Sequence, residues 1–165
     1  PIFARHAKKK IKGKNLICVA PDVGGTERAR ALGKLLNVGL AIVDKRRPKP
    51  GQSQVMNVVG DVTGKTCILV DDIIDSGGTI VNAAQALKKR GAKEVYVYIT
   101  HGVLSGDAVK KIKNSVIKNL VITDTIDNSG KIKSIKNIEV LPISGLMGEA
   151  IKRISNSTSV SDLFK

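Results

Sequence analysis

A nine-residue run carries most of the side chains that could do chemistry in this chain: three carboxylates, two hydroxyls and two glycines. The run contains Asp71, Asp72, Asp75, Ser76, Gly77, Gly78 and Thr79. Because glycine has no Cβ, the backbone at Gly77 and Gly78 can approach an anion closely, and the hydroxyls beside it can donate hydrogen bonds. The neighbouring carboxylates could hold sugar hydroxyls or Mg²⁺. These residue types at this spacing favour a site for a phosphorylated sugar.

The sequence around this run predicts a buried strand before it and a helix after it. Residues 68–70 are continuously apolar and follow a turn at Gly64 and Lys65, a pattern typical of a parallel strand covered on both faces. A helix over 80–90 would direct the positive end of its dipole at the same anion. Ligands bind at the carboxyl ends of strands in open α/β sheets, where the acids lie. The alternative is structural: acids that end a strand and a Ser-Gly-Gly-Thr segment that caps a helix.

Apolar strands and amphipathic helices alternate along the rest of the chain. Further strands are expected over 16–20, 39–43, 55–59, 94–100, 120–125 and 138–141, and further helices over 27–36, 107–114 and 146–155. In the last helix Leu146, Ala150 and Ile154 share one face, which predicts that they point inward. This alternation predicts an α/β fold with a mainly parallel sheet that helices cover on both faces.

Length and composition are those of one domain with a substantial core. The chain has 165 residues, of which 42% are hydrophobic, and four residues are aromatic, so the core must consist of aliphatic side chains. We expect this domain to occupy residues 15–165, after a basic lead-in segment over 1–14.

The excess of positive charge raises the question of a nucleic-acid partner. Lysine and arginine number 28 against 14 acids, which gives a formal net charge of +14. Such a charge favours polyanions in general. The sequence shows no aromatic stacking surface, no RNA-binding signature and no helix-turn-helix pattern. We therefore expect no specific nucleic-acid partner and interpret the lysines as a solvated surface.

Neither a membrane segment nor a disulfide framework is evident. No apolar run approaches the ~20 residues that span a bilayer, and no signal peptide is visible, so no membrane association is expected. Cys18 and Cys67 lie within expected central strands and are interpreted as reduced core residues, with a disulfide or a metal site as the alternative. A cytoplasmic location is the expectation from these features.

Two other segments place charged residues after expected strands. Asp22 follows the first strand and precedes the pair Gly24 and Gly25. After the second strand, residues 45–49 contain four cations in five positions, beginning with Lys45. Cations that bridge phosphate oxygens are the main requirement of phosphoryl transfer. A solvated loop is the alternative for the basic segment.

The run over 71–79 resembles the phosphoribosyl-diphosphate loop shared by type I phosphoribosyltransferases and ribose-phosphate diphosphokinases, also called ribose-phosphate pyrophosphokinases. The Pro-Asp-x-Gly-Gly segment at Asp22 and the Lys-Arg-Arg-Pro segment at Lys45 resemble elements of the diphosphokinases. The resemblance runs in unbroken order from about Asp22 to the C-terminus. It implies a type I phosphoribosyltransferase-like fold.

The resemblance also implies a reaction and a role for each matching residue. The diphosphoryl group of Mg·ATP would pass to the anomeric oxygen of ribose 5-phosphate, giving phosphoribosyl diphosphate and AMP for nucleotide biosynthesis. Lys45 and Arg47 would be catalytic, and Asp22 would contact Mg²⁺, the implied cofactor. The residues implied to bind ribose 5-phosphate are Arg47, Asp71, Asp72, Asp75, Ser76, Gly77, Gly78 and Thr79.

The resemblance covers about the C-terminal half of the family's usual length. The other half in that family supplies most of the ATP pocket, including an arginine-glutamine element and a Mg²⁺-binding histidine that match nothing here. Family oligomers complete the ATP site across subunits, so a homo-oligomer is expected. Three alternatives stay open: a non-catalytic regulatory homologue, an inactive half-length remnant, and a type I phosphoribosyltransferase. The last of these gives no reason for Lys45 or Asp22.

Overall fold

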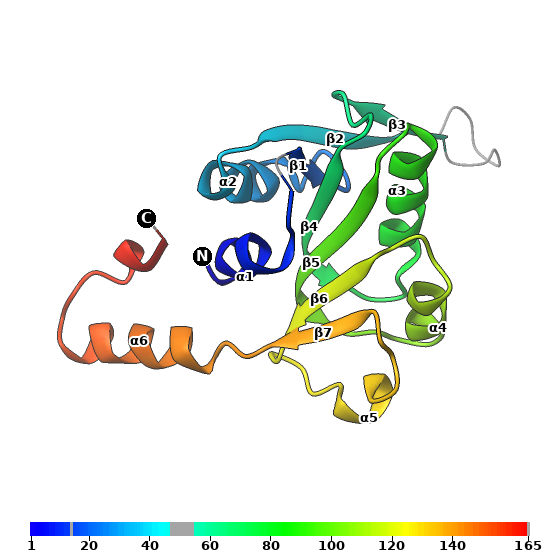
Figure 1. Ribbon diagram of the computed structural model, residues 1–165. Helices are drawn as coiled ribbons and strands as arrows, with labels where there is room; N and C mark the ends of the chain where they lie inside the picture. The colour runs from blue at the N-terminus through cyan, green and yellow to red at the C-terminus, as the bar shows by residue number, and fades with distance from the viewer. Residues whose placement is uncertain (14, 47–54, 165) are drawn as a thin grey trace.

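The computed structural model describes residues 1–13, 15–46 and 55–164 as alternating helices and strands (Figure 1). In chain order the elements are α1 (Ile2–Lys10), β1 (Leu16–Ala20), α2 (Thr26–Leu36), β2 (Gly39–Arg46), β3 (Val55–Val59), β4 (Thr66–Ile74), α3 (Gly78–Lys89), β5 (Glu94–Gly102), α4 (Ala108–Lys113), β6 (Asn119–Thr123), α5 (Ser129–Ile132), β7 (Ile138–Leu141), α6 (Ser144–Ser155) and the 3₁₀ helix η1 (Ser161–Phe164).

The strands of the described residues form one sheet of seven in the order β3-β2-β1-β4-β5-β6-β7. All neighbouring pairs are parallel except β2 and β3, which are antiparallel. The central strands β1 and β4 are therefore covered by neighbours on both sides, and their carboxyl ends meet at one edge of the sheet. The expectation of a mainly parallel α/β sheet is confirmed.

Helices cover both faces of this sheet, as the continuous apolar strands predict. Successive residues of β4 enter different layers: Leu69 packs with the face that carries α3 and α4, whereas Ile68 packs with the face that carries α1 and α2. Figure 1 shows these helix pairs on opposite sides of the strands. The layer with α3 and α4 is aliphatic apart from Cys67, as the composition predicts, whereas the layer with α1 and α2 also buries Tyr96 and Tyr98.

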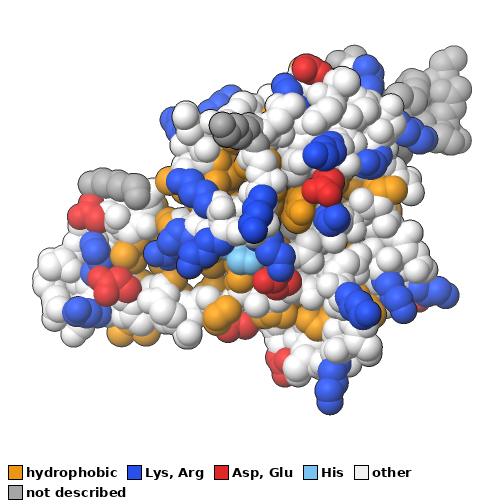
Figure 2. Space-filling model, in the orientation of Figure 1, with side chains coloured by type: hydrophobic (Ala, Val, Ile, Leu, Met, Phe, Trp, Pro, Cys, Tyr) orange, Lys and Arg blue, Asp and Glu red, His pale blue; other side chains and the backbone are white. Residues whose placement is uncertain are grey.

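The basic segment at the start of the chain forms a helix that packs on the sheet. Ala4 and Ala7 of α1 are buried, and Figure 2 shows Lys and Arg side chains gathered over this region. The imidazole of His6 lies 3.0 Å from the Tyr98 hydroxyl and 3.1 Å from a carboxylate oxygen of Glu139. Polar contacts thus fasten α1 to β5 and β7.

Glu139 makes a pH-dependent contribution to this attachment. Burial acts to raise its pKa, but hydrogen bonds from Lys10, His6 and Asn119 outweigh that effect and hold the pKa below the ordinary 4.5. The stabilisation is therefore present above the unfolded-state pKa and is lost as pH falls through the folded-state pKa. We expect Glu139→Gln to flatten the fall of Tm with decreasing pH below 4.5 in melts followed by circular dichroism. A slope equal to that of the unaltered chain would contradict this assignment.

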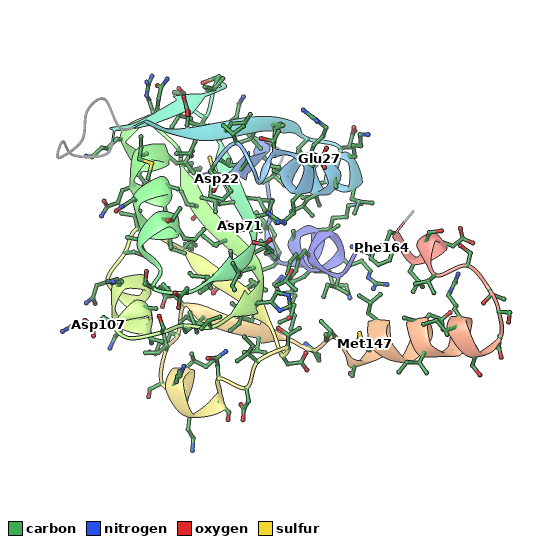
Figure 3. The ribbon with its side chains drawn as sticks, turned by 180° about the vertical axis from the view of Figure 1, so that it is seen from behind. Asp22, Glu27, Asp71, Asp107, Met147 and Phe164 are labelled. Atoms are coloured by element: carbon green, nitrogen blue, oxygen red, sulfur yellow. The ribbon has the colours of Figure 1, made fainter. Side chains whose placement is uncertain are left out.

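The last helix, α6, differs from its sequence prediction. None of its residues is buried, and Ile151 and Ile154 are 62% and 67% exposed. Leu146 and Ala150 are only partly buried. Figures 1 and 3 show the helix extending away from the sheet, with Met147 far from the strands. The prediction that this apolar face points inward is wrong, because helical spacing identifies a stripe without identifying what covers it.

Exposure of α6 predicts tolerance to charge on its apolar stripe. At concentrations where the chain is monomeric, changing Ile151 and Ile154 together to lysine should alter the free energy of unfolding by less than about 1 kcal/mol, since neither side chain leaves a packed core. Urea denaturation measures this change. Ile80→Lys is the control, because Ile80 is 2% exposed and its replacement should prevent stable folding. A loss of several kcal/mol in the α6 variant would show that this helix is packed in solution.

The two cysteines are free and buried, as expected. Cys18 packs in the layer under α1 and α2, whereas Cys67 packs in the opposite layer. Burial raises the pKa of both thiols to about 12, so both stay protonated and unreactive at neutral pH. No helix among the described residues combines the length and the apolarity that crossing a membrane requires.

Candidate functional site

The predicted site lies where β4 ends and α3 begins. Strand β4 is longer than its apolar run: it continues through Asp71 and Asp72 to Ile74, and Asp71 pairs with Ile99 of β5. The continuous apolar run predicts only the first buried part of the strand, because Asp71, Asp72 and Ile73 are more exposed and only Ile74 is buried again. The acids still lie near its carboxyl end, at the edge where ligands of parallel sheets bind.

The turn between β4 and α3 depends on Gly77 more than on Gly78. Gly77 precedes the first residue of α3 and has a φ of +76°, a left-handed conformation that disfavours other residues. A Cβ on Gly78 would approach only the hydroxyl of Ser76, at 4.0 Å. The first glycine is thus required by the backbone. The second is not required by the unliganded turn.

A cleft of about 240 Å³ lies at this junction. Its lining residues are Asp22, Asp71, Ile73, Ile74, Asp75, Ser76, Gly77, Thr79 and Ile80. Six of these are predicted site residues, and they come from β4, from the turn after it, from the start of α3, and from the loop after β1. Asp72 and Gly78 are not among the lining residues. Figure 3 shows Asp22 and Asp71 near each other at the ends of their adjacent strands.

The loop after β1 is shaped around the carboxylate of Asp22. The backbone N–H of Gly25 donates to Asp22 Oδ1 at 2.9 Å. A Cβ on Gly24 would lie 3.3 Å from the same oxygen, and one on Gly25 would lie 3.3 Å from the Pro21 ring. The glycine pair therefore makes room for the acid that precedes it.

Arg28 of α2 joins the two adjacent acids, a contact that sequence reasoning missed. One terminal nitrogen of its guanidinium lies 2.7 Å from Asp71 Oδ1 and the other lies 2.5 Å from Asp72 Oδ2. Arg28 has the appearance of helix surface charge in the sequence. Only the pairing of β1 with β4 brings the start of α2 beside these acids, and no local spacing signals that pairing.

The ionisation of Asp71 reflects its position in the cleft. Burial raises its pKa above the ordinary carboxyl value, and the N–H of Asp72 and the nearby Arg28 oppose the shift only in part. A cation bound in the cleft would favour the charged form and lower this pKa. The position and the raised pKa of Asp71 thus suit a ligand that is cationic or that carries hydroxyl groups.

The carboxylates of the cleft fit Mg²⁺ that takes only some of its ligands from the protein. Within residues 1–13, 15–46 and 55–164, no group of three or more histidine, cysteine or acidic side chains could hold a metal ion by itself. Mg²⁺ usually binds one or two carboxylates and takes its remaining ligands from water and substrate phosphates. Asp22 and Asp71 share the cleft, so the chain fits Mg²⁺ that arrives with a phosphorylated substrate.

The second basic segment, which starts at Lys45, begins at the same edge of the sheet. Strand β2 runs parallel to β1, and Ile42 pairs with Ala20 at the end of β1, so Lys45 lies toward the carboxyl end of β2, at the sheet edge that also carries the Asp22 loop. The backbone of Lys45 also pairs with Met56 of β3. Arg47 lies outside the described residues.

Comparisons with known proteins match this arrangement. The family model described as the phosphoribosyl synthetase-associated domain matches residues 44–165. Ribose-phosphate pyrophosphokinase of Rhizobium meliloti (strain 1021) is 57% identical over 99% of this chain and 53% of its own length. The protein of the same name from Pasteurella multocida (strain Pm70) is 51% identical, over 99% of this chain and 52% of its own length. The chain spans about half the length of the curated relatives it matches.

Solved structures show the same fold. Phosphoribosylpyrophosphate synthetase from Mycobacterium smegmatis superposes with a TM-score of 0.83 and 33% identity, over 94% of this chain and 50% of that one. Purine phosphoribosyltransferase from Pyrococcus horikoshii superposes with a TM-score of 0.51 and 19% identity, over 86% of this chain and 77% of that one, a likeness of fold alone. The expected type I phosphoribosyltransferase-like fold is confirmed.

Proposed function

This chain belongs to the family of the phosphoribosyl synthetase-associated domain, and from that premise we propose that it transfers the diphosphoryl group of Mg·ATP to ribose 5-phosphate. The products are phosphoribosyl diphosphate and AMP, for nucleotide biosynthesis. The observation that carries the proposal is the cleft in which Asp22, Asp71 and the turn over 75–79 converge. Its relatives named ribose-phosphate pyrophosphokinase support it as well.

Ribose 5-phosphate binds with its 5-phosphate in the turn over 75–79. Gly77 lets the backbone approach the phosphate, and the hydroxyls of Ser76 and Thr79 donate to it. The positive end of the α3 dipole points at the same position. The sugar hydroxyls lie near Asp71 and Asp72, whose charges Arg28 partly balances. Because Arg28 makes this part of the site less negative, a second anion, the nucleotide, can bind beside the sugar.

Transfer occurs by attack of the anomeric oxygen of ribose 5-phosphate on the β-phosphorus of ATP. A new oxygen–phosphorus bond forms, the bond between that phosphorus and the oxygen bridging to the α-phosphorus breaks, and AMP leaves while the anomeric hydroxyl loses its proton. Lys45 and Arg47 stabilise the charge that shifts onto the phosphate oxygens. Arg47 also contacts the sugar phosphate. Asp22, with Asp71 in the same cleft, holds Mg²⁺, which when bound neutralises part of the nucleotide's charge.

Removing the polar side chains of the turn tests this binding mode. Changing Asp75 and Thr79 together to alanine should weaken ribose 5-phosphate binding by about tenfold or more, because Thr79 loses its hydrogen bond to the charged phosphate and Asp75 can no longer accept one from a sugar hydroxyl. Isothermal titration calorimetry measures the affinity. The matched control changes Asp127 and Ser129, an acid and a hydroxyl at the start of α5, to alanine. Unchanged affinity in the Asp75 and Thr79 variant would remove the turn from the site.

A phosphoribosyltransferase activity is the second candidate, because the run over 71–79 resembles a loop that both enzyme classes share. Such an enzyme consumes phosphoribosyl diphosphate and a nucleobase and has no use for ATP. Turnover with a nucleobase and without ATP would replace the proposal above. A non-catalytic or incomplete chain would show neither activity. This third candidate stays open because the chain covers only about half of the relatives' length.

We further propose that the chain acts in the cytoplasm as a homo-oligomer. The exposed apolar side chains of α6, with Met147 50% and Ile151 62% exposed, favour association between copies. Light scattering should give a mass of at least twice 17.6 kDa. A monomer at all concentrations would contradict this part of the proposal.

A further inference from the structure

Three consecutive carbonyls of the turn, those of residues 74–76, are held by one neighbouring segment, residues 103–111. The donors are Val103 N and Leu104 N to Ile74 O at 3.0 and 3.2 Å, Ser105 N to Asp75 O at 3.1 Å, and Lys111 Nζ to Ser76 O at 3.3 Å. Each carbonyl therefore points toward the connection between β5 and α4 or toward α4 itself.

This arrangement decides where the amide hydrogens of the turn point. The described peptide bonds are all trans, and in a planar trans peptide the C=O and the following N–H point in opposite directions. The N–H groups of Asp75, Ser76 and Gly77 consequently point away from the 103–111 segment. All three residues line the cleft, and no residue of the 103–111 segment does. Successive N–H groups turned to one side form a concave binding site for an anion.

The 103–111 segment is held firmly enough to act as a support. Leu104 is 1% exposed and has a φ of +51°, a conformation that a bulky side chain rarely adopts. This conformation allows the successive N–H groups of Val103 and Leu104 to reach the same carbonyl, that of Ile74. Ala108 of α4 is fully buried, and its Cα lies 3.7 Å from where a Cβ on Gly77 would be. Helix α4 thus packs directly behind the turn.

Among the residues that the structure describes, the lining of the cleft supplies no cation to a bound phosphate. The lining includes the carboxylates of Asp22, Asp71 and Asp75 and no lysine or arginine among the described residues. Arg28 is engaged by both Asp71 and Asp72. Within the described part of the chain, Lys111 is the cation that donates a hydrogen bond to the turn.

We propose that Lys111 is the cationic positioning residue of the phosphate site. Its ammonium group holds the Ser76 carbonyl, keeps the Gly77 N–H directed into the cleft, and offsets the negative charge of the bound 5-phosphate. This inference rests on the proposed function, because the phosphate it concerns is that of ribose 5-phosphate.

Calorimetric titrations of three variants with ribose 5-phosphate and with inorganic phosphate test the role of Lys111. Lys111→Met keeps the aliphatic stem and removes the charge, and should bind both ligands about tenfold more weakly. Lys111→Arg should restore most of the affinity, which a purely structural role would not require. Lys113→Met, which changes a second exposed lysine of the same helix, should bind as the unaltered chain does.

The outcomes separate this inference from the proposed function. Wild-type affinity in Lys111→Met, or equal losses in Lys111→Met and Lys113→Met, would overturn the role of Lys111. If the unaltered chain binds inorganic phosphate with the expected dependence on Lys111 but binds ribose 5-phosphate no better, the inference stands and the proposed substrate falls. Binding of neither ligand by the unaltered chain would overturn both.

Discussion

Replacing Lys45 with alanine is expected to lower the rate of AMP formation from Mg·ATP and ribose 5-phosphate by about 10²- to 10³-fold. Diphosphoryl transfer leaves the protein little covalent work, so its rate depends on cations that stabilise the shifting phosphate charge. The backbone of Lys45 lies at the carboxyl end of β2, at the sheet edge that carries Asp22. Affinity for ribose 5-phosphate should stay unchanged, because its phosphate binds at 75–79. Phosphorus NMR gives the rate, and calorimetry gives the affinity.

Two further variants separate a specific role of Lys45 from general basicity. Lys49→Ala removes a cation from the same basic segment and should leave the rate close to that of the unaltered chain. Lys45→Arg keeps the charge and should retain part of the activity, with a loss because guanidinium and ammonium differ in geometry. A near-normal rate in Lys45→Ala, or an equal loss in Lys49→Ala, would remove Lys45 from the catalytic site.

Gly60→Ala is expected to destabilise the fold by about 3 kcal/mol, from an unfavourable φ together with overpacking. Gly60 lies between β3 and β4 with a φ of +107°. A Cβ there would lie 3.0 Å from the Cβ and 3.2 Å from the Cα of Ala41, which is fully buried in β2. Because the second of these atoms is backbone, a rotamer change cannot relieve the contact. Urea denaturation measures the loss.

Two other glycines serve as controls that divide this cost into its parts. Gly64 has a φ of +68°, and a Cβ added there would meet nothing within 4 Å, so Gly64→Ala should cost only about 1 to 2 kcal/mol of backbone strain. Gly148 of α6 has neither constraint, and Gly148→Ala should be neutral or stabilising by up to about 1 kcal/mol. Equal stability of the Gly60 and Gly64 variants would show that Ala41 moves aside.

The sequence predicts the fold well where local signals and burial agree. The apolar run at 68–70, the turn at Gly77 and the helix after it are each specified by neighbouring residues. The same local signals bring Asp71 and the turn together. Their prediction therefore required no knowledge of strand order.

Features that depend on distant residues could not be predicted in this way. The contact of Arg28 with the two acids follows from the pairing of β1 and β4, and the contact of Lys111 with Ser76 follows from the packing of α4 behind α3. The prediction for α6 is wrong for the same reason, its dependence on distant residues. Its apolar stripe is not buried by any other part of the described chain. The proposed roles of Lys45 and Arg47 stay predictions, since the Arg47 position lies outside the described residues.

Phosphorus NMR of the chain with Mg·ATP and ribose 5-phosphate tests the central claim most directly. The spectra are recorded first for the chain alone. They are recorded again after adding the half of the Rhizobium meliloti relative that this chain does not match, made separately; the match covers 53% of that relative. We expect AMP and phosphoribosyl diphosphate to appear in equal amounts, at the latest in the second mixture. ATP that stays intact in both mixtures, or turnover that needs a nucleobase in place of ATP, would contradict the claim.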